Sequence, residues 1–177
     1  FRFFYYKCCI GKNILLYNAT FIIKEPKSKT HVSWHQDLTY WGFDKNEKQV
    51  SAWIALSNVN DLSGCMKMIP GSHKKGSFDH KSTNDINNVL SRGQTVLNVE
   101  EDKAISCPLL PGEASFHHGL TLHASQPNNS NDRRIGLNLQ FITTDMQQLK
   151  SDNDSAILVR GKDNYNNFKI CLLYTSD

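Results

Sequence analysis

Short apolar or alternating runs, separated by turn signals, dominate this sequence and restrict the folds open to it. Residues 13–23 (NILLYNATFII), 50–56 (VSAWIAL) and 135–142 (IGLNLQFI) have the alternation and composition of β-strands. Two more strands are predicted at residues 114–118 and 120–123, with Gly119 as a turn or bulge between them. Many short strands joined by Gly/Pro turns favour a sandwich, a jelly roll or a small barrel.

Helical signals are sparse by comparison. Only residues 83–91 (TNDINNVLS) suggest a short helix, with Thr83 or Asn84 as its N-cap. We therefore predict a mainly β fold with minor helices, in one domain, because 177 residues suffice for one sizeable core. No apolar stretch is long enough to span a membrane.

Composition narrows the classes of partner. The chain is 39% hydrophobic and 21% charged, and its net charge of +3 is too small to indicate nucleic acid or a membrane surface as a partner. The five cysteines are odd in number and form no CxxC pair, so neither a disulfide framework nor a zinc finger is indicated. We expect a small-molecule partner and a reducing, intracellular and cytoplasmic setting.

Both ends of the sequence are unusual. The chain does not begin with Met, so we expect the natural N-terminus to lie further upstream. Residues 171–177 (CLLYTSD) resemble one reading frame of a sequencing-library adapter and are predicted to be a non-native tail. We therefore assign residues 11–170 to one N-terminally truncated domain, and neither end informs on organelle targeting or oligomeric state.

The stretch SWHQDLTYWGF contains the first chemical signal. His35 and Asp37 are two residues apart, and side chains at that spacing share one face of a strand. Alone the pair is weak, because His-x-Asp is common by chance. Two histidines and one carboxylate, however, hold non-haem Fe(II) and leave part of the ion open. The candidate third ligands are the other histidines, at positions 31, 73, 80, 117, 118 and 123.

The strongest local context among these belongs to His123, in LHASQPNNSNDRRIGLNLQFI. Arg134 follows it by eleven residues and opens an apolar, alternating strand. A buried arginine at this place could clamp a dicarboxylate through paired hydrogen bonds. An oxygenase that consumes 2-oxoglutarate needs such a cation, because the keto-acid end chelates iron and the far carboxylate needs a fixed partner.

Four motifs in this order resemble the phytanoyl-CoA dioxygenase superfamily: WHQD, VSAWIAL, GCMKMIPGSH and LHAS-PN-S-RR-IG. The resemblance runs from about Gly11 to Ile170, and is closest to a branch often labelled "chlorinating enzyme"-like. It implies a double-stranded β-helix, that is, a cupin-like jelly roll. It also implies a dioxygenase that uses Fe(II), 2-oxoglutarate and O2 and releases succinate and CO2 as it hydroxylates a small organic substrate.

The resemblance also implies the ligands of the metal. His35, Asp37 and His123 match the family's iron ligands. Iron halogenases of this branch replace the aspartate by a small residue, and the vacated position holds chloride. Because Asp37 is retained here, hydroxylation is favoured over halogenation.

The remaining site residues follow from the same resemblance. Arg134 matches the arginine that binds 2-oxoglutarate, Trp53 a tryptophan that lines the cosubstrate pocket, and Ser125 a serine near the cosubstrate. Trp41 falls where relatives contact substrate. Lys24 has two interpretations: an exposed lysine at a strand end, which its position favours, or a substrate contact at the mouth of the site.

Other polar residues receive structural interpretations. We expect His117 and His118 to serve the strand, His73 to hold a loop, and Arg133 to be a solvated surface charge. Trp53 could also be a core residue.

Three other functions remain open. They are a non-catalytic jelly-roll binding module with a vestigial or zinc-binding site, an iron halogenase, and a metal-dependent hydrolase. The hydrolase would need a glutamate or histidine to activate water, and the glutamates are distant from these motifs in sequence.

Overall fold

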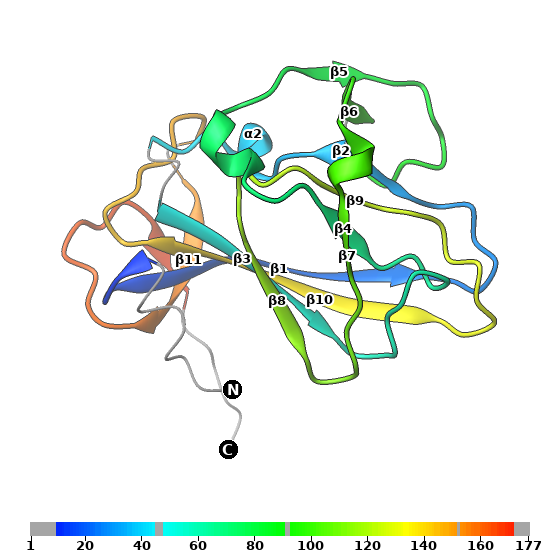
Figure 1. The fold of residues 1–177 in the computed structure, drawn as a ribbon. Coiled ribbons are helices and arrows are strands. Elements are labelled where there is room, and N and C mark those ends of the chain that lie inside the picture. Colours follow the sequence, from blue (N-terminus) through cyan, green and yellow to red (C-terminus); the bar gives the residue numbers. More distant parts are fainter. Residues whose placement is uncertain (1–9, 45–47, 91–92, 152, 172–177) are drawn as a thin grey trace.

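A computed structural model of the chain describes residues 10–44, 48–90, 93–151 and 153–171 (Figure 1). The first nine residues, and residues 172–177 of the predicted non-native tail, lie outside the described residues. The described secondary structure is mostly strand, with three short helices. In chain order the elements are β1 (Ile14–Lys24), β2 (Val32–His35), α2 (Leu38–Trp41), β3 (Gln49–Ala55), β4 (Met66–Met68), the 3-10 helix η2 (Ser72–Lys75), β5 (His80–Ser82), β6 (Gln94–Val96), the 3-10 helix η3 (Glu101–Lys103), β7 (Ile105–Cys107), β8 (Ala114–His118), β9 (His123–Ser125), β10 (Arg134–Thr143), β11 (Ser155–Arg160) and β12 (Lys169–Ile170).

Two sheets form the body of the molecule. The larger has the order β12-β11-β1-β10-β3-β8, and the smaller has the order β2-β9-β4-β7. In Figure 1 the smaller sheet lies above the larger one, and the β5–β6 hairpin lies at the top. Apart from the parallel β11–β12 pair, the strand pairs of both sheets are antiparallel. The predicted mainly β jelly roll is confirmed.

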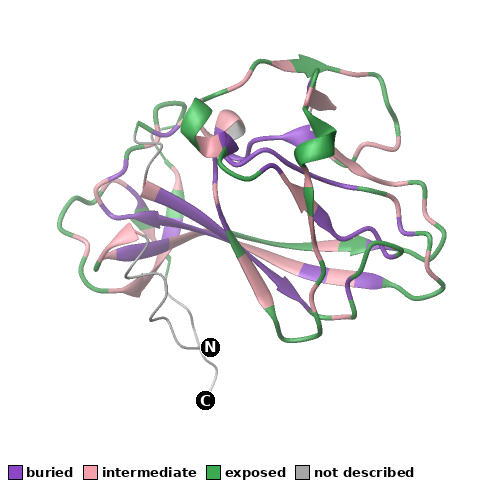
Figure 2. Ribbon diagram, viewed as in Figure 1, coloured by how far each residue is buried: buried purple, intermediate pink, exposed green. Residues whose placement is uncertain are grey.

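Strand β3 shows how the sequence places residues between the sheets. It lies between β10 and β8, and all seven of its residues are buried. Alternation puts Gln49, Ser51 and Trp53 on one face of this strand. On neighbouring β10, Gly136 leaves room for the Trp53 ring, because a Cβ at Gly136 would lie 1.9 Å from it. Figure 2 shows burial concentrated in the strands and exposure in the connections.

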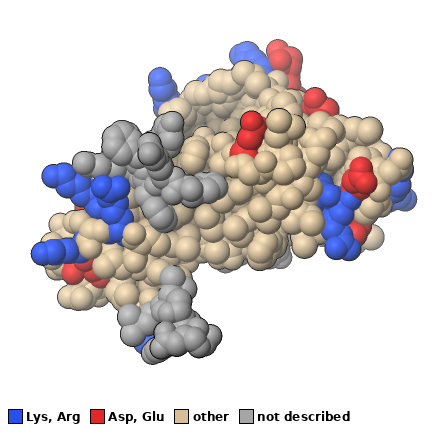
Figure 3. Space-filling model, turned by 90° about the horizontal axis from the view of Figure 1, so that it is seen from below, with Lys and Arg blue, Asp and Glu red and all other residues tan. Residues whose placement is uncertain are grey.

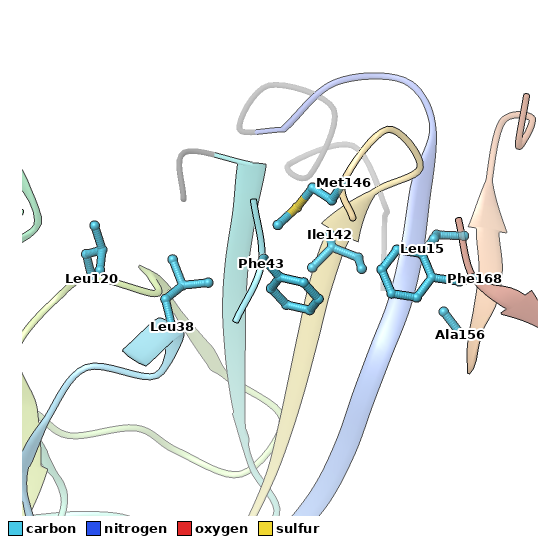
Figure 4. Packing of buried hydrophobic residues seen from close by; sticks show 8 residues of the cluster. All are labelled: Leu15, Leu38, Phe43, Leu120, Ile142, Met146, Ala156 and Phe168. Atoms are coloured by element: carbon cyan, nitrogen blue, oxygen red, sulfur yellow. The ribbon is translucent and has the colours of Figure 1, made fainter. Parts of the chain in front are cut away.

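An apolar cluster at one end of the sandwich anchors α2. Figure 4 shows its eight side chains, which come from the strands, from α2 and from connecting segments: Leu15, Leu38, Phe43, Leu120, Ile142, Met146, Ala156 and Phe168. The amide of Leu38 donates a hydrogen bond to the carbonyl of Gly119 (3.2 Å), which ties the start of α2 to the turn after β8. The short helix is therefore fixed by packing and by a tertiary hydrogen bond, since four residues cannot stabilise a helix alone.

Two predicted elements are wrong. Described residues 83–90 form no helix, because the segment hydrogen-bonds to the chain around His31 instead. The backbone amide of His31 donates to the carbonyl of Asn87 (3.0 Å), and the carbonyl of His31 accepts from the amide of Val89 (3.0 Å). Asparagine side chains support such irregular backbone. The strand predicted at residues 120–123 lies instead at His123–Ser125, because the turn at Gly119 extends further than expected.

Two general expectations can be compared with the described residues. No helix among them is long and apolar enough to cross a bilayer. The cysteines that the structure describes, Cys65, Cys107 and Cys171, are free thiols. On the face shown in Figure 3, acidic and basic side chains both occur toward the ends of the molecule, and no broad patch of one sign is visible.

The Gly136–Trp53 contact yields a stability prediction. Gly136→Ala should destabilise the protein by about 1–3 kcal/mol, because the added methyl overpacks the Trp53 ring. Urea denaturation of the two proteins measures this difference. In a double-mutant cycle with Trp53→Leu, the cost of the methyl should shrink because the ring it meets is gone. An equal cost in both backgrounds would contradict this account.

Candidate metal centre

Three predicted ligands meet between the sheets. His35 is the last residue of β2, Asp37 is the N-cap of α2, and His123 is the first residue of β9. Strands β2 and β9 pair with His35 opposite His123, which explains how residues 88 positions apart become neighbours. One ligand atom from each side chain lies within 4.8 Å of the others, and all three residues are buried.

The local backbone differs from the expected one. We predicted that strand alternation would put His35 and Asp37 on one face, but the strand ends at His35. The chain turns into α2, and Asp37 has α-helical backbone angles (φ −56°, ψ −48°). The two side chains still converge: His35 Nε2 lies 3.4 Å from Asp37 Oδ1, and His123 Nε2 lies 3.7 Å from the same oxygen.

The histidine rings are oriented by the backbone. His35 Nδ1 lies 2.9 Å from the carbonyl of Ser33, and His123 Nδ1 lies 2.9 Å from the carbonyl of Thr121. A carbonyl can only accept, so each Nδ1 carries a proton, which leaves Nε2 as the ring nitrogen that can bind a metal. This is the tautomer that a metal-binding histidine needs.

Electrostatics keep the cluster in its ligand form. Burial acts to raise the pKa of Asp37, but the imidazoles of His123, His117 and His35 hold it well below its usual range. Burial lowers the pKa of His123 well below its usual value, and His35 lowers it further. An ionised Asp37 carboxylate and a His123 ring with a low pKa can bind a divalent cation without first losing a proton.

The second oxygen of Asp37 has different neighbours. Ser51 Oγ donates a hydrogen bond to Asp37 Oδ2 (2.7 Å), and Gln49 Nε2 donates to Ser51 Oγ (2.9 Å). His117 Nε2 lies 3.4 Å from the same Oδ2, and its ring packs against His123 with centroids 4.6 Å apart. Neither ring nitrogen of His117 makes a hydrogen bond to a described residue.

A cationic pair lies in the same cavity as the cluster. Arg134 opens β10 and Lys24 ends β1, and the two residues are paired across the strands. Both are almost fully buried, with 2% and 1% exposed. Arg134 Nε and Nη2 have no hydrogen-bond partner among the described residues, and the guanidinium carbon lies 5.2 Å from the Trp53 ring centroid. Buried donors without partners are costly, so their presence in a cavity indicates a ligand that accepts from them.

The interpretation of Lys24 as an exposed strand-end lysine is wrong. Its Nζ donates to the carbonyl (3.0 Å) and to the hydroxyl (2.7 Å) of Ser125, and also to the carbonyl of Gln126. Three acceptors use all three ammonium hydrogens, so Lys24 adds charge to the cavity rather than a free donor. Burial lowers the pKa of Lys24 to about 7, and the charge of Arg134 contributes to the shift.

The cavity itself joins the two groups. It has a volume of about 620 Å³ and is lined by the three clustered ligands, by Arg134, Lys24 and Ser125, and by Trp53 and Trp41. All eight predicted site residues thus reach one space. Trp53 is also buried against Val59 and Cys65, so its two predicted roles, core residue and pocket wall, coexist.

The other candidate histidines lie outside this cluster. His31 lies 3.4 Å from Asp85, and His73 stacks on His118 with centroids 5.4 Å apart. His80 Nε2 accepts from the amide of Gln36 (3.1 Å). Arg133 is exposed, as expected, and pairs with Glu25.

Comparison with known proteins is consistent with this geometry. Residues 6–136, more than half of the chain, match the family described as phytanoyl-CoA dioxygenase (PhyH). The chain belongs to the phytanoyl-CoA dioxygenase family. It is 33% identical over 140 residues to a probable alpha-ketoglutarate-dependent hypophosphite dioxygenase of Stutzerimonas stutzeri, covering 77% of this chain and 48% of the relative. It is 29% identical over 145 residues to human peroxisomal phytanoyl-CoA dioxygenase, covering 80% and 43%.

Solved structures share the fold. A nickel complex of the non-heme monooxygenase ThoJ superposes with a TM-score of 0.77 at 27% identity, over 97% of this chain and 61% of that chain. EvdO2 from Micromonospora carbonacea var. aurantiaca, complexed with 2-oxoglutarate, superposes with a TM-score of 0.65 at 27% identity, over 77% and 55%. The chain spans about half the length of the curated relatives it matches.

Sequence reasoning missed Ser51, Gln49 and the contact of His117 with Asp37. A signal for the first two existed, because the alternation of VSAWIAL puts Ser51 on the same face as Trp53. His117 was interpreted as structural, and the pairing of Ser51 with His117 across β3 and β8 aims both at one carboxylate. The sequence alone did not predict this contact, because it depends on the register between β3 and β8.

The cluster predicts selective loss of metal binding. His35→Ala and His123→Ala should each weaken binding of Co(II) by more than about 100-fold, because each removes one of three ligand atoms. Titration monitored by visible absorbance measures the affinity. His73→Ala is the matched control, since His73 lies outside the cluster, and it should bind as the unmodified protein does. Equal loss in the control would exclude this site as the metal centre.

Proposed function

We propose that this protein is a non-haem Fe(II)- and 2-oxoglutarate-dependent dioxygenase that hydroxylates a small organic substrate. One observation carries the proposal: a buried His/Asp/His cluster and a buried arginine with unpartnered donors share one cavity. The His/Asp/His cluster alone, or the buried arginine alone, would fit other kinds of binding site. Together they match the two ends of 2-oxoglutarate, whose keto acid chelates iron and whose far carboxylate needs a cation.

The residues fit the metal. His35 Nε2, Asp37 Oδ1 and His123 Nε2 converge, and the low pKa of Asp37 provides one negative charge among them. Two imidazoles and one carboxylate suit Fe(II) and leave further positions on the ion for other ligands. When bound with 2-oxoglutarate and O2, the ion would supply the oxidising chemistry, in which one oxygen atom enters succinate and the other enters the substrate.

The residues also fit the cosubstrate. Arg134 offers Nε and Nη2 to a carboxylate, and a planar guanidinium pairs with carboxylate oxygens in a fixed geometry. Ser125 Oγ accepts from Lys24, so its own hydroxyl hydrogen is available for a second bond to that carboxylate. Trp53 stacks against the guanidinium and fixes its orientation.

The protein's part in the reaction is positioning. Lys24 and Arg134 draw the dianion into the cavity, and the buried His35, Asp37 and His123 would hold the ion that orients it. Trp41, from the helix that follows Asp37, lines the cavity on the side of the metal cluster and is a candidate substrate contact. No general base is required for this reaction, and the cavity wall formed by the described residues offers no glutamate.

The alternative functions fit less well. A halogenase needs an open ligand position where Asp37 stands, and Asp37 is present and hydrogen-bonded. A hydrolase needs a glutamate or a histidine to activate water; the described cavity wall has no glutamate, and His117, its one histidine besides the two predicted ligands, lies against Asp37 Oδ2 at 3.4 Å. A binding module could use the unpartnered donors of Arg134 for an anionic ligand, but it would not need the converging His35, Asp37 and His123 in the same cavity. We further propose a small-molecule substrate and an intracellular, cytoplasmic location.

Binding of 2-oxoglutarate tests the proposal. The anaerobic Fe(II) protein should develop a weak visible charge-transfer band when 2-oxoglutarate is added. Arg134→Gln should weaken this binding by about 100-fold or more, because each charge-assisted hydrogen bond contributes about 1.5–3 kcal/mol. Neighbouring Arg133→Gln is the matched control and should leave the band unchanged, since Arg133 is exposed. A metal-loaded, folded protein without the band would contradict the proposal.

The charge on Lys24 predicts a pH dependence. A bound carboxylate favours the ammonium form, so it raises the pKa of Lys24 above the value of about 7 in the free protein. Affinity for 2-oxoglutarate should therefore fall as the pH rises above 7, by at most about tenfold per pH unit. Isothermal titration between pH 7 and 9 measures the slope. Lys24→Met should flatten it, whereas exposed Lys27→Met should not; identical slopes would exclude Lys24 as the source.

A further inference from the structure

The two oxygens of Asp37 have separate environments. Oδ1 faces His35 and His123, whereas Oδ2 faces away from them and accepts the hydroxyl hydrogen of Ser51 at 2.7 Å. His117 Nε2 flanks Oδ2 at 3.4 Å. A carboxylate free to rotate could present either oxygen, or both, to an ion. Here, one oxygen is held before any ion arrives.

The hydrogen bond that Gln49 donates to Ser51 determines where the Ser51 hydroxyl hydrogen points. A hydroxyl has a single hydrogen, and Gln49 Nε2 donates to Ser51 Oγ at 2.9 Å, so that oxygen's hydrogen must point elsewhere. The remaining polar partner is Asp37 Oδ2. Ser51 and Gln49 are both completely or almost completely buried, so water does not compete for these bonds.

The turn after β8 leaves room for the Gln49 amide. A Cβ at Gly119 would lie 2.1 Å from Gln49 Oε1, which makes no hydrogen bond to a described residue, so a side chain at position 119 would displace this amide. The carbonyl of Gly119 accepts from the amide of Leu38, the residue after Asp37. The chain of contacts thus closes on itself: the turn that admits Gln49 also holds the backbone that carries Asp37.

We propose that Ser51, held by Gln49, is a positioning residue that keeps Asp37 bound to the metal through Oδ1 alone. This inference rests on the proposed function. An octahedral ion has six positions; three protein atoms and the two chelating atoms of 2-oxoglutarate leave one position for O2. If both oxygens of Asp37 bound the ion, that last position would be lost. Ser51 therefore preserves the open position without touching the ion.

Binding of Co(II) in the full chain is the test, because its visible absorption reports both affinity and coordination number. Ser51→Ala should weaken binding by about 10-fold, the lower range for loss of a hydrogen bond to a metal ligand. Its bands should also lose intensity, since a higher coordination number gives weaker absorption. Ser115→Ala is the matched control: Ser115 lies on adjacent β8, outside the cavity wall, and its buried hydroxyl has no partner among the described residues.

The outcomes separate the two proposals. If the unmodified protein binds no Co(II), the proposed function is overturned and this inference with it. If the unmodified protein binds Co(II) and Ser51→Ala binds it with the same affinity and spectrum, only the positioning role is overturned. The positioning role is also overturned if Ser115→Ala loses as much Co(II) affinity as Ser51→Ala. Equal melting temperatures of the metal-free proteins would show that the fold is unchanged. If Ser51→Ala does not fold, Gln49→Met tests the same chain one residue further back and should give the same changes in smaller measure.

Discussion

A negative charge buried between two sheets is the constraint on which the arrangement of this protein depends. The Asp37 carboxylate has only 7% of its residue surface exposed, and isolated burial of a charge would be prohibitive. The cost of burying the Asp37 charge is offset by a hydroxyl donor and by three imidazoles from β2, β8 and β9. Satisfying one carboxylate therefore requires both sheets and the start of α2 to meet at one point.

Charge balance extends this constraint across the cavity. Arg134 and Lys24 bring two buried cations to the same space, so the described cavity wall carries more positive than negative charge in the absence of ligands. Burial lowers the pKa of Arg134 to about 10 and that of Lys24 to about 7, because it removes both cations from water. A divalent cation at the His/Asp/His cluster and a dicarboxylate at Arg134 would balance these charges and give the Arg134 donors an acceptor.

The sequence predicted these parts unequally, for physical reasons. Strands β1, β3 and β10 were found to within a residue, because each is a run of seven or more residues rich in apolar and β-branched side chains. The ligand His123 was found through its spacing to Arg134 and a family resemblance, although its strand was misplaced by three residues. The helix predicted at residues 83–91 failed because its backbone found partners around His31, a tertiary effect that local propensity does not include.

The burial of Lys24 could not be predicted from the sequence. A lysine at the end of a strand is usually solvated, and nothing local in IIKEP indicates otherwise. Its ammonium group is buried against the carbonyl and hydroxyl of Ser125, the last residue of β9, and the carbonyl of Gln126, which lie 101 and 102 residues away. The β1–β10 pairing places Lys24 beside Arg134, and strand β9 of the other sheet places Ser125 against Lys24. Topology, and no local pattern, thus brings the lysine, the arginine and the serine to one cavity.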